Sequence, residues 1–295
     1  MARDSKNQTQ NGRLNGKSSV GDAVRHGVAV SDATFARLRP VATAMDPATI
    51  HHFRTTIRRL RSLLSSFKET SPPAERRALS NRLKNLSQRY AAIREWDVLI
   101  QALGKDRDHA DPRLSQKLAA AAKRRRHAVA NGDHPLPEDL AAIDREIAAA
   151  AWLHAPSPGE AEIWSERIDD YAAGLLDRQR RKLRRKSRTV DLSDAAAFHK
   201  FRIAAKKHRY TIESLSSLYR KKDVKPYLER VVAIQDVLGE MRDAIVAEEL
   251  IGQLGLTPPV LETAKTWLAR RADEGRARFP ACRAAFRRET PFWER

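Results

Sequence analysis

Cysteine and long apolar runs are nearly absent from this sequence of 295 residues. Cys282 is the single cysteine, which excludes an internal disulfide framework and a zinc site built from several thiolates. No run of 18 apolar residues occurs, so no segment is expected to cross a membrane. The first 20 residues lack the apolar stretch of a secretory signal, and residues 1–15 are predicted to be a disordered polar tail. These absences favour a soluble protein of the cytoplasm.

Acidic charge and aromatic side chains are scarce beside the basic charge. The chain has 56 Lys and Arg against 37 Asp and Glu, a formal net charge of +19, and aromatic residues make up only 6%. The basic residues are grouped: segment 178–188 holds eight of them and no acid, and segment 51–61 holds four arginines and no acid. A surface that is only solubilising does not need such grouping, so we expect a negatively charged partner.

Strand signals are missing as well, because no convincing run alternates β-branched and polar residues. Apolar residues instead return every three or four positions, which is the pattern of amphipathic helices. Prolines and glycines mark the breaks between them. We therefore predict an all-α protein with helices at residues 20–38, 48–68, 73–103, 112–130, 137–153, 160–187, 194–220, 224–253 and 259–288.

The sequence matches itself at an offset of 148 positions. His51 falls on His199 in one predicted helix, and Arg94 falls on Arg242 in a later one. Chance could produce one such coincidence, but it would hardly produce two separate segments in the same register. The match indicates internal duplication of a helical unit.

The duplicated unit predicts two similar helical bundles, formed by residues 16–155 and 156–295. Two such bundles usually pack about a pseudo-twofold axis, which brings equivalent helices face to face. We therefore expect the basic residues of the repeated helices to face one shared cavity.

Each copy of the repeated helix carries a row of cations beside an apolar stripe. Like charges this close on a helix cost a few tenths of a kcal/mol per pair, so their repetition suggests a bound anion that offsets the cost. The alternative is that long basic side chains merely lie along a bundle edge with their charged ends in water. Positions 0, 3, 7 and 10 of a helix lie on one side, and here they are His51, Arg54, Arg58 and Arg61 in the first copy and His199, Arg202, Lys206 and Arg209 in the second.

The two histidines are also candidate metal ligands. Neither His51 nor His199 has His, Asp or Glu three or four positions later, and a ring of arginines disfavours a metal cation. We therefore predict no metal and no cofactor. Each histidine is instead expected to donate a hydrogen bond to an anion or to carry a charge in the field of the neighbouring cations.

Two segments, HHFRTTIRRLRSLLSSF and FHKFRIAAKKHRYTIESL, carry a specific pattern. At these segments the sequence resembles the CHAD family, the conserved histidine α-helical domain. RYAAIREWDVLIQAL and LERVVAIQDVLGEMRDAIVAEEL are similar to the long helices that follow each signature, and the ending with Phe292 and Trp293 is also similar. The resemblance covers nearly everything after the tail. Two departures are the acidic, Ala-rich helix 137–153 and His208, which stands where the family usually has an aliphatic residue.

The resemblance implies two four-helix bundles around a basic groove or pore that binds inorganic polyphosphate. We predict binding without catalysis, with targeting to polyphosphate granules as one candidate role. Glu95 and Asp243 each follow one of the arginines, and they either orient those side chains through salt bridges or belong to ordinary helix surface. The predicted polyphosphate-binding residues are His51, Arg54, Arg58, Arg59, Arg61, Arg94, Lys123, Arg181, Arg185, His199, Arg202, Lys206, Lys207, Arg209, Arg242 and Arg271.

Other functions compete with this one. A phosphohydrolase acting on polyphosphate needs carboxylates that hold Mg²⁺ beside the cations, but the repeated rows contain none and no P-loop motif occurs. Non-specific nucleic-acid binding fits the net charge, yet aromatic stacking platforms and helix-turn-helix or zinc-finger spacings are not evident. A structural adaptor that coats polyphosphate bodies is a third class. The sequence does not determine the oligomeric state.

Overall fold

The computed structural model describes residues 14–106, 112–132 and 135–294. The predicted tail, residues 1–15, lies almost wholly outside these ranges. Within them the chain forms helices and no strands, which confirms the all-α prediction. No helix in the described part of the chain is both long and apolar enough to cross a membrane.

The helices lie close to their predicted positions. Their bounds are α1 Val20–Leu38, α2 Pro47–Ser66, α3 Pro73–Arg89, α4 Ala91–Lys105, α5 Pro112–Ala130, α6 Leu136–Ala149, α7 Ala161–Ser165, α8 Ile168–Thr189, α9 Ala195–Leu215, α10 Lys221–Gly252 and α11 Pro258–Arg288.

The single helix predicted over 73–103 is wrong, because the chain breaks it at Tyr90 into α3 and α4. Tyr90 leaves the helical conformation, with φ −99° and ψ 10°. Its ring is fully buried and its hydroxyl donates to the Asp139 carboxylate at 2.7 Å. Burial of this side chain and its bond to α6 fix the bend, and neither contact is visible in the local periodicity.

The helix predicted over 160–187 is also interrupted, by two extended residues between α7 and α8, Glu166 and Arg167. Glu166 has ψ 149°, and its carbonyl accepts a hydrogen bond from the Val20 amide at 2.9 Å. The Ile168 amide in turn donates to the Ser18 carbonyl at 3.0 Å. The hydrogen bonds between the starts of α1 and α8 therefore hold this segment extended and prevent a continuous helix.

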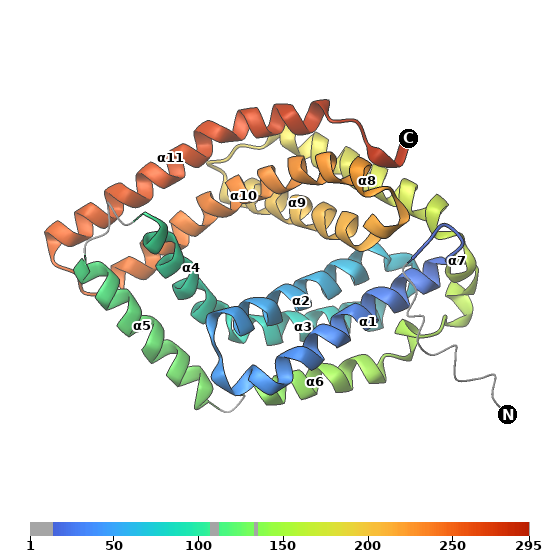
Figure 1. The fold of residues 1–295 in the computed structure, drawn as a ribbon, viewed down its shortest axis with the longest axis horizontal. Coiled ribbons are helices and arrows are strands. Elements are labelled where there is room, and N and C mark those ends of the chain that lie inside the picture. The colour runs from blue at the N-terminus through green and yellow to red at the C-terminus, as the bar shows by residue number, and fades with distance from the viewer. Residues whose placement is uncertain (1–13, 107–111, 133–134, 295) are drawn as a thin grey trace.

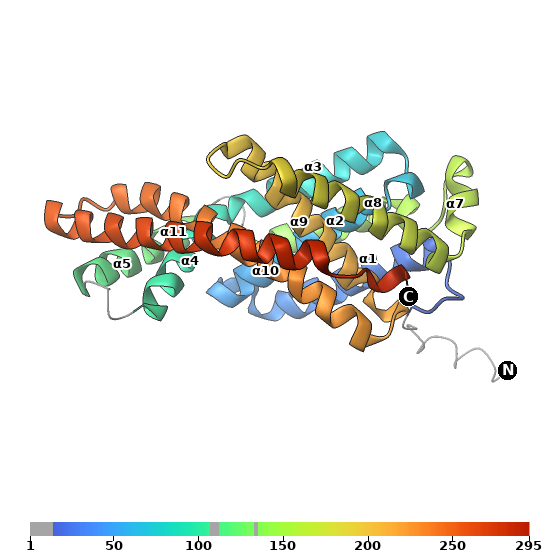
Figure 2. The same cartoon turned by 90° about the horizontal axis from the view of Figure 1, so that it is seen from above.

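The helices form an elongated molecule, in which two groups of helices run along the long axis (Figure 1). The end away from the two chain termini is narrower, and we call it the far end. Helix α1 packs against α2, and α8 packs against α9. Between these groups, α2 contacts α9 and α4 contacts α10. Helices α10 and α11 run side by side for most of their length, and with α4 and α5 they build the far end (Figure 2).

Two contacts between the predicted halves join residues whose numbers differ by 148 or by one less. The isolated bridge joins Ser19 and Arg167, and Glu95 forms a salt bridge with Arg242. A twofold relation between the halves predicts contacts of this kind. Both halves contribute to one main core cluster, and a smaller cluster is formed by α4, α5, α10 and α11. The division into two duplicated halves stays a prediction.

The apolar stripes of both repeated helices are buried, as predicted. The second one is interrupted by a polar residue, His208, which is fully buried. Its Nε2 lies 2.9 Å from the Tyr227 hydroxyl and its Nδ1 lies 3.4 Å from the Gln179 side-chain oxygen. Burial lowers the pKa of His208 to about 3, so its ring is neutral. The buried members of the stripes are Phe53, Ile57, Leu60, Leu64 and Phe67 in α2 or at its end, and Phe198, Phe201, Ala205, Ile212 and Leu215 in α9.

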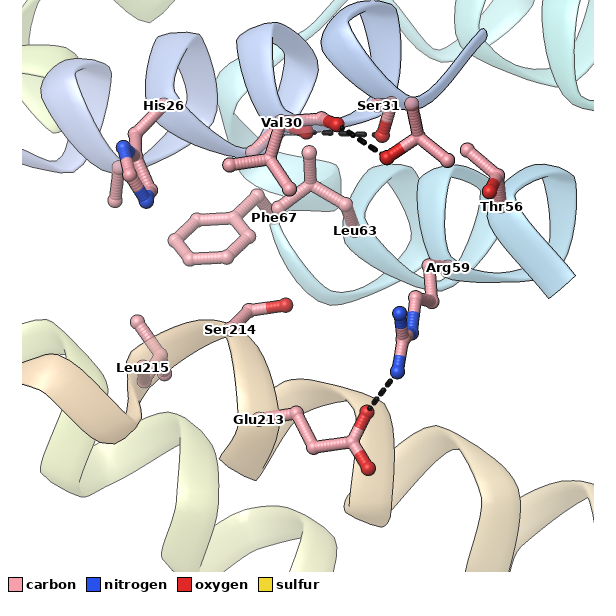
Figure 3. A pocket seen from close by; sticks show the side chains of 13 residues that line it. His26, Val30, Ser31, Thr56, Arg59, Leu63, Phe67, Glu213, Ser214 and Leu215 are labelled. Carbon is pink, nitrogen blue, oxygen red and sulfur yellow. Dashed lines mark hydrogen bonds and ion pairs between the residues drawn. The ribbon is translucent and has the colours of Figure 1, made fainter. Parts of the chain in front are cut away.

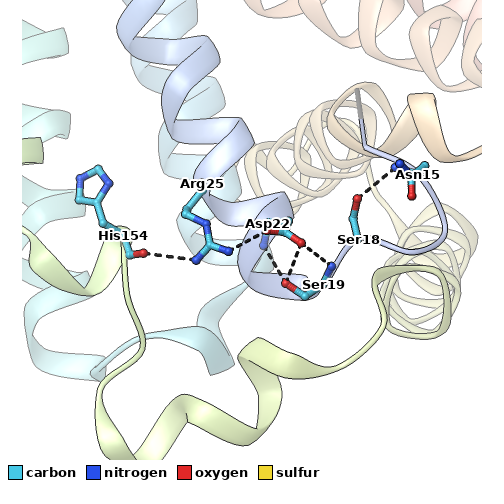
Figure 4. Close-up of polar contacts among 6 residues, drawn as sticks. All are labelled: Asn15, Ser18, Ser19, Asp22, Arg25 and His154. Carbon is cyan, nitrogen blue, oxygen red and sulfur yellow. Dashed lines mark hydrogen bonds and ion pairs between the residues drawn. The ribbon is translucent and has the colours of Figure 1, made fainter. Parts of the chain in front are cut away.

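Helix α1 begins with a capping box (Figure 4). The Asp22 amide donates to the Ser19 hydroxyl at 3.1 Å, and the Ser19 amide donates to the Asp22 carboxylate at 2.8 Å. Arg25 extends this network, because it donates to Asp22 at 2.7 Å and to the His154 carbonyl at 3.3 Å. These bonds satisfy the free amides of the first turn and attach α1 to the segment that follows α6.

Helix α6, which corresponds to the acidic helix predicted over 137–153, binds to arginines of the first half. Asp139 in α6 is buried, and it accepts hydrogen bonds from the Arg89 guanidinium and the Tyr90 hydroxyl. Asp144 and Glu146 form ion pairs with arginines of the segment after α1 and of α3. Helix α6 thus neutralises basic side chains on the outside of the first half and leaves those between α2 and α9 untouched.

Replacing Asp139 by Asn is expected to lower the free energy of unfolding by about 3 kcal/mol, because it removes a buried charge while Arg89 and Tyr90 keep their donors. Urea denaturation at pH 7 measures the loss. Asp144→Asn is the control, since its partly exposed pair with Arg39 should contribute less than about 1 kcal/mol. Similar losses from both variants would contradict a special role of the buried contact.

Candidate anion-binding site

Four helices from both halves bring basic side chains together where α2 meets α9 and α4 meets α10. Burial lowers the pKa values of the basic side chains in this group, and the charge of at least one of Arg58, Arg94, Arg202 and Arg242 lowers each of them further; the affected residues are His51, Arg54, Arg94, Arg202 and Lys206. We call this group the central cluster, and it consists of His51, Arg54, Arg58, Arg94, Arg202, Lys206 and Arg242.

The two rows begin in the same way. Asp46 caps α2 and accepts hydrogen bonds from the amides two and three positions later. Asp194 caps α9 with the same pattern, and it lies 148 positions further along the chain. His51 and His199 each follow their cap by five residues, so both rows start in the same register on their helices. Each cap fixes the phase of the row that follows it.

Burial weakens the charged state of the cluster. It lowers the pKa of Lys206 to about 7, with further contributions from Arg202 and Arg58. It lowers the pKa of Arg54 to about 10, and Arg58 acts in the same direction. These cations are poorly solvated and close to one another, so an anion that pairs with them would relieve both costs.

His51 is also partly buried beside other cations of the central cluster. Burial lowers the pKa of His51 to about 4, and the charges of Arg94 and Arg58 add to the effect. Its ring is therefore neutral at pH 7. Its Nδ1 atom is buried, and the described residues supply no hydrogen-bond partner for it. A neutral imidazole with a free nitrogen can donate a hydrogen bond to a phosphate oxygen without adding charge.

Glu95 and Asp243 orient an arginine of the cluster. The Arg242 guanidinium lies 2.6 Å from Glu95 and 3.3 Å from Asp243. Although burial opposes its charge, these two carboxylates raise the pKa of Arg242. Arg54 is held in another way, since it donates to the Ser87 carbonyl at the end of α3. Of the two interpretations of Glu95 and Asp243, the salt bridges support orientation, with Arg242 as the partner in both cases.

Two predicted residues, Arg59 and Arg209, lie outside the cluster. Both form ion pairs with Glu213, at 3.1 Å and 2.7 Å. Arg59 and Glu213 border a cavity of about 140 Å³ between α1, α2 and α9, whose floor includes Leu63 and Phe67 (Figure 3). The two arginines thus share one carboxylate, and the charge of Arg59 also contributes, after burial, to lowering the pKa of His51.

Arg61 and Lys207 lie at a different place again. Lys207 donates to the Ser65 carbonyl and hydroxyl at 2.8 and 2.7 Å, and Arg61 donates to the Ser80 hydroxyl at 3.2 Å. Burial lowers the pKa of Lys207 to about 8, with contributions from Lys182, Lys68 and Arg76. Lys207, Lys182, Lys68 and Arg76 form a separate basic group near the C-terminal end of α2.

The remaining predicted residues are dispersed. Arg271 stacks over the Trp267 ring at 5.3 Å, and it shares with Arg94 the lining of a cavity of about 240 Å³. Arg181 forms an ion pair with Asp177 at 2.9 Å. Four of the predicted residues are exposed, and within the described ranges no hydrogen bond or ion pair joins them to the central cluster; they are Lys123, Arg181, Arg185 and His199.

A family model of the CHAD domain matches residues 31–252. The chain belongs to the CHAD family. This CHAD chain is similar to the solved CHAD domain of the plant Ricinus communis, at 26% identity and a TM-score of 0.74, over 93% of this chain and 94% of that one. It also has the fold of PptA from Streptomyces chartreusis, at 17% identity and a TM-score of 0.60, over 94% of this chain and 100% of that one. No curated protein matches the CHAD chain closely enough to count as a relative.

The family assignment bears on both signatures, because α2 and α9 lie entirely inside the matched region. CHAD domains are associated with polyphosphate-related proteins. The central cluster is therefore built from the segments that carry the family resemblance, whereas α11 lies beyond the matched residues.

Proposed function

We propose that this CHAD protein binds inorganic polyphosphate at the central cluster and does not cleave it. The observation that carries the proposal is the convergence of partly buried basic residues from α2, α4, α9 and α10. The carboxylates that contact the cluster, Glu95 and Asp243, are both engaged by Arg242. The positive charge therefore exceeds the negative charge that the described residues place beside it.

Polyphosphate fits this arrangement better than nucleic acid does. It offers about one charge per phosphate and no base, and guanidinium groups bind its oxygens through two parallel hydrogen bonds. The aromatic residues beside the rows, such as Phe53 and Phe201, are fully buried and cannot stack on bases. Nucleic acid is expected to bind only non-specifically, through charge.

The lack of catalysis is part of the proposal. Phosphoryl transfer needs carboxylates that are free to hold Mg²⁺ beside the transferred group. Glu95 and Asp243 instead hold an arginine in place. A binder without turnover suits a role on polyphosphate granules in the cytoplasm.

Competition between long-chain polyphosphate and duplex DNA at equal phosphate concentration tests the proposal. Polyphosphate is expected to displace labelled DNA at both 50 and 200 mM salt, because a shaped site retains contacts that screening removes from a purely electrostatic complex. Equal competition by DNA at both salt levels would contradict a polyphosphate site.

The same samples test for turnover. With Mg²⁺ present, no orthophosphate should be released and the chain-length distribution should stay unchanged. Release that stops when Glu95 or Asp243 is replaced by its amide would show that the protein is an enzyme.

A further inference from the structure

A second group of arginines lies between α8 and α11, apart from the central cluster. Arg184 is close enough to Arg180, Arg188 and Arg287 for their charges to lower its pKa, after burial as the first cause. Arg283 joins them from α11, because it donates to the Ser187 carbonyl of α8 at 3.2 Å. We call this group the α8/α11 cluster, and it consists of Arg180, Arg184, Arg188, Arg283 and Arg287.

Two members are held in place by the protein. Arg180 donates to the Glu289 carbonyl at 3.3 Å. The Arg283 guanidinium, besides its bond to Ser187, lies 5.8 Å from the centre of the Phe279 ring. These contacts use backbone oxygens and an aromatic face, so they position the guanidinium groups and leave their charges unneutralised.

The other members lack partners. Among residues that the structure describes, no hydrogen bond or ion pair reaches the side chains of Arg184, Arg188 or Arg287. The Nε atoms of Arg180 and Arg184 are buried without a hydrogen-bond partner in the same ranges. Buried donors of this kind are costly, so the group is suited to a ligand that accepts several hydrogen bonds.

The neighbouring carboxylates are already engaged outside the group. Glu289 pairs with Arg230 at 3.5 Å, and Asp177 pairs with Arg181 at 2.9 Å. The α8/α11 cluster is therefore an unneutralised concentration of positive charge on two neighbouring helices, which the hydrogen bond from Arg283 to the Ser187 carbonyl joins.

We propose that the α8/α11 cluster binds a terminal phosphate group, supplied by free pyrophosphate or by the end of a polyphosphate chain. A terminal phosphate has three non-bridging oxygens and carries more charge than an internal one, so it can accept bonds from several guanidinium forks at once. Four of the five arginines are partly buried, which suits a compact anion more than a long chain lying across the surface. The proposal does not depend on what the central cluster binds.

Calorimetric titration with pyrophosphate tests whether the α8/α11 cluster binds a terminal phosphate group. The measurement uses the full chain carrying Arg58→Gln and Arg202→Gln, so that the central cluster is weakened. Pyrophosphate is expected to bind this variant, and adding Arg184→Gln and Arg287→Gln is expected to weaken its binding by at least about tenfold. Thermal stability without ligand should stay unchanged or rise, because the second pair of changes relieves repulsion. A matched control adds Arg77→Gln and Lys84→Gln, two exposed cations of α3, and should leave pyrophosphate binding unchanged.

Further probes identify the source of the phosphate. Cyclic trimetaphosphate has no terminal group, so it should not bind. Linear tripolyphosphate that binds as tightly as pyrophosphate would assign the site to chain ends, and weaker binding would assign it to the free anion. The proposal is overturned if pyrophosphate does not bind, if binding survives Arg184→Gln with Arg287→Gln, or if trimetaphosphate binds equally well. None of these results bears on long-chain polyphosphate binding by the unchanged central cluster.

Discussion

Replacing Arg58 and Arg202 together by Gln is expected to weaken the binding of long-chain polyphosphate by about 100-fold. Both side chains lie in the central cluster, one from each half. A hydrogen bond to a charged group contributes about 1.5–3 kcal/mol, so the loss of two corresponds to about 3 kcal/mol or more. Gln keeps a good helix propensity, and the removal of two like charges should leave thermal stability unchanged or slightly higher.

The salt dependence of binding separates a shaped site from total charge. Each phosphate contact releases condensed counterions, so a plot of log K against log salt should become shallower by about 1.4 when two contacts are lost. Fluorescence anisotropy at four salt concentrations measures this slope. The control is Arg77→Gln with Lys84→Gln, which removes the same formal charge from the exposed side of α3. An equal loss from both double variants would mean that net charge alone binds the anion.

The sequence predicted that the residues of the central cluster lie on equivalent faces of two helices, and their role in binding stays a prediction. The repeated spacing places His51, Arg54 and Arg58 on one helix and Arg202 and Lys206 on the other, and the structure adds that an aspartate caps each helix. Local periodicity decides which face of a helix is apolar, so the row beside that face is also determined. The repeat then predicted that the two rows meet.

The ends of the rows could not be predicted in this way. Arg61 and Arg209 share the face of His51 and His199 on a helical projection, but they lie ten residues further on, about 15 Å along the axis. At that distance they meet other partners, Ser80 for Arg61 and Glu213 for Arg209. A projection along the axis discards this separation, and only the tertiary arrangement restores it.

The α8/α11 cluster was missed for a different reason. The basic segment 178–188 contains Arg184, but Arg184 and Arg287 do not recur at the 148-residue offset, where they correspond to Ala36 and Asp139. The available signal was a row of three arginines spaced four residues apart in α8, and a pair with the same spacing in α11. Such pairs become a cluster only where two helices place them side by side, which the periodicity of either helix does not reveal.

Polyphosphate binding at pH 8 is expected to be accompanied by the uptake of close to one proton. Burial, with Arg202 and Arg58, lowers the pKa of Lys206 to about 7 in the free protein, so most molecules carry a neutral amine at pH 8. A bound anion favours the ammonium form and raises that pKa. Affinity should therefore fall as the pH rises above 7, by up to about tenfold per pH unit until the pKa of the bound state is reached.

Without ligand the same group makes stability depend on pH in the opposite direction. The pKa of Lys206 lies below its ordinary value of 10.5, so between about 7 and 10.5 the unfolded chain binds more protons than the folded one. The free energy of unfolding contributed by this group therefore rises with pH across that window. Polyphosphate should reduce or reverse this slope, since it raises the pKa in the folded state.

Calorimetry at pH 8 in two buffers with different ionisation enthalpies measures the proton uptake directly. Lys206→Arg keeps a permanent charge, so it should abolish most of the uptake and flatten the affinity between pH 7 and 9. Lys207 has a pKa of about 8 and lies in the separate basic group, so Lys207→Arg should leave most of the uptake in place. His51, with a pKa of about 4, stays neutral in this range and makes no contribution. Proton uptake that is unchanged in Lys206→Arg, or absent from the unaltered protein, would show that the anion does not approach the amine of Lys206. That result would exclude the central cluster as the binding site.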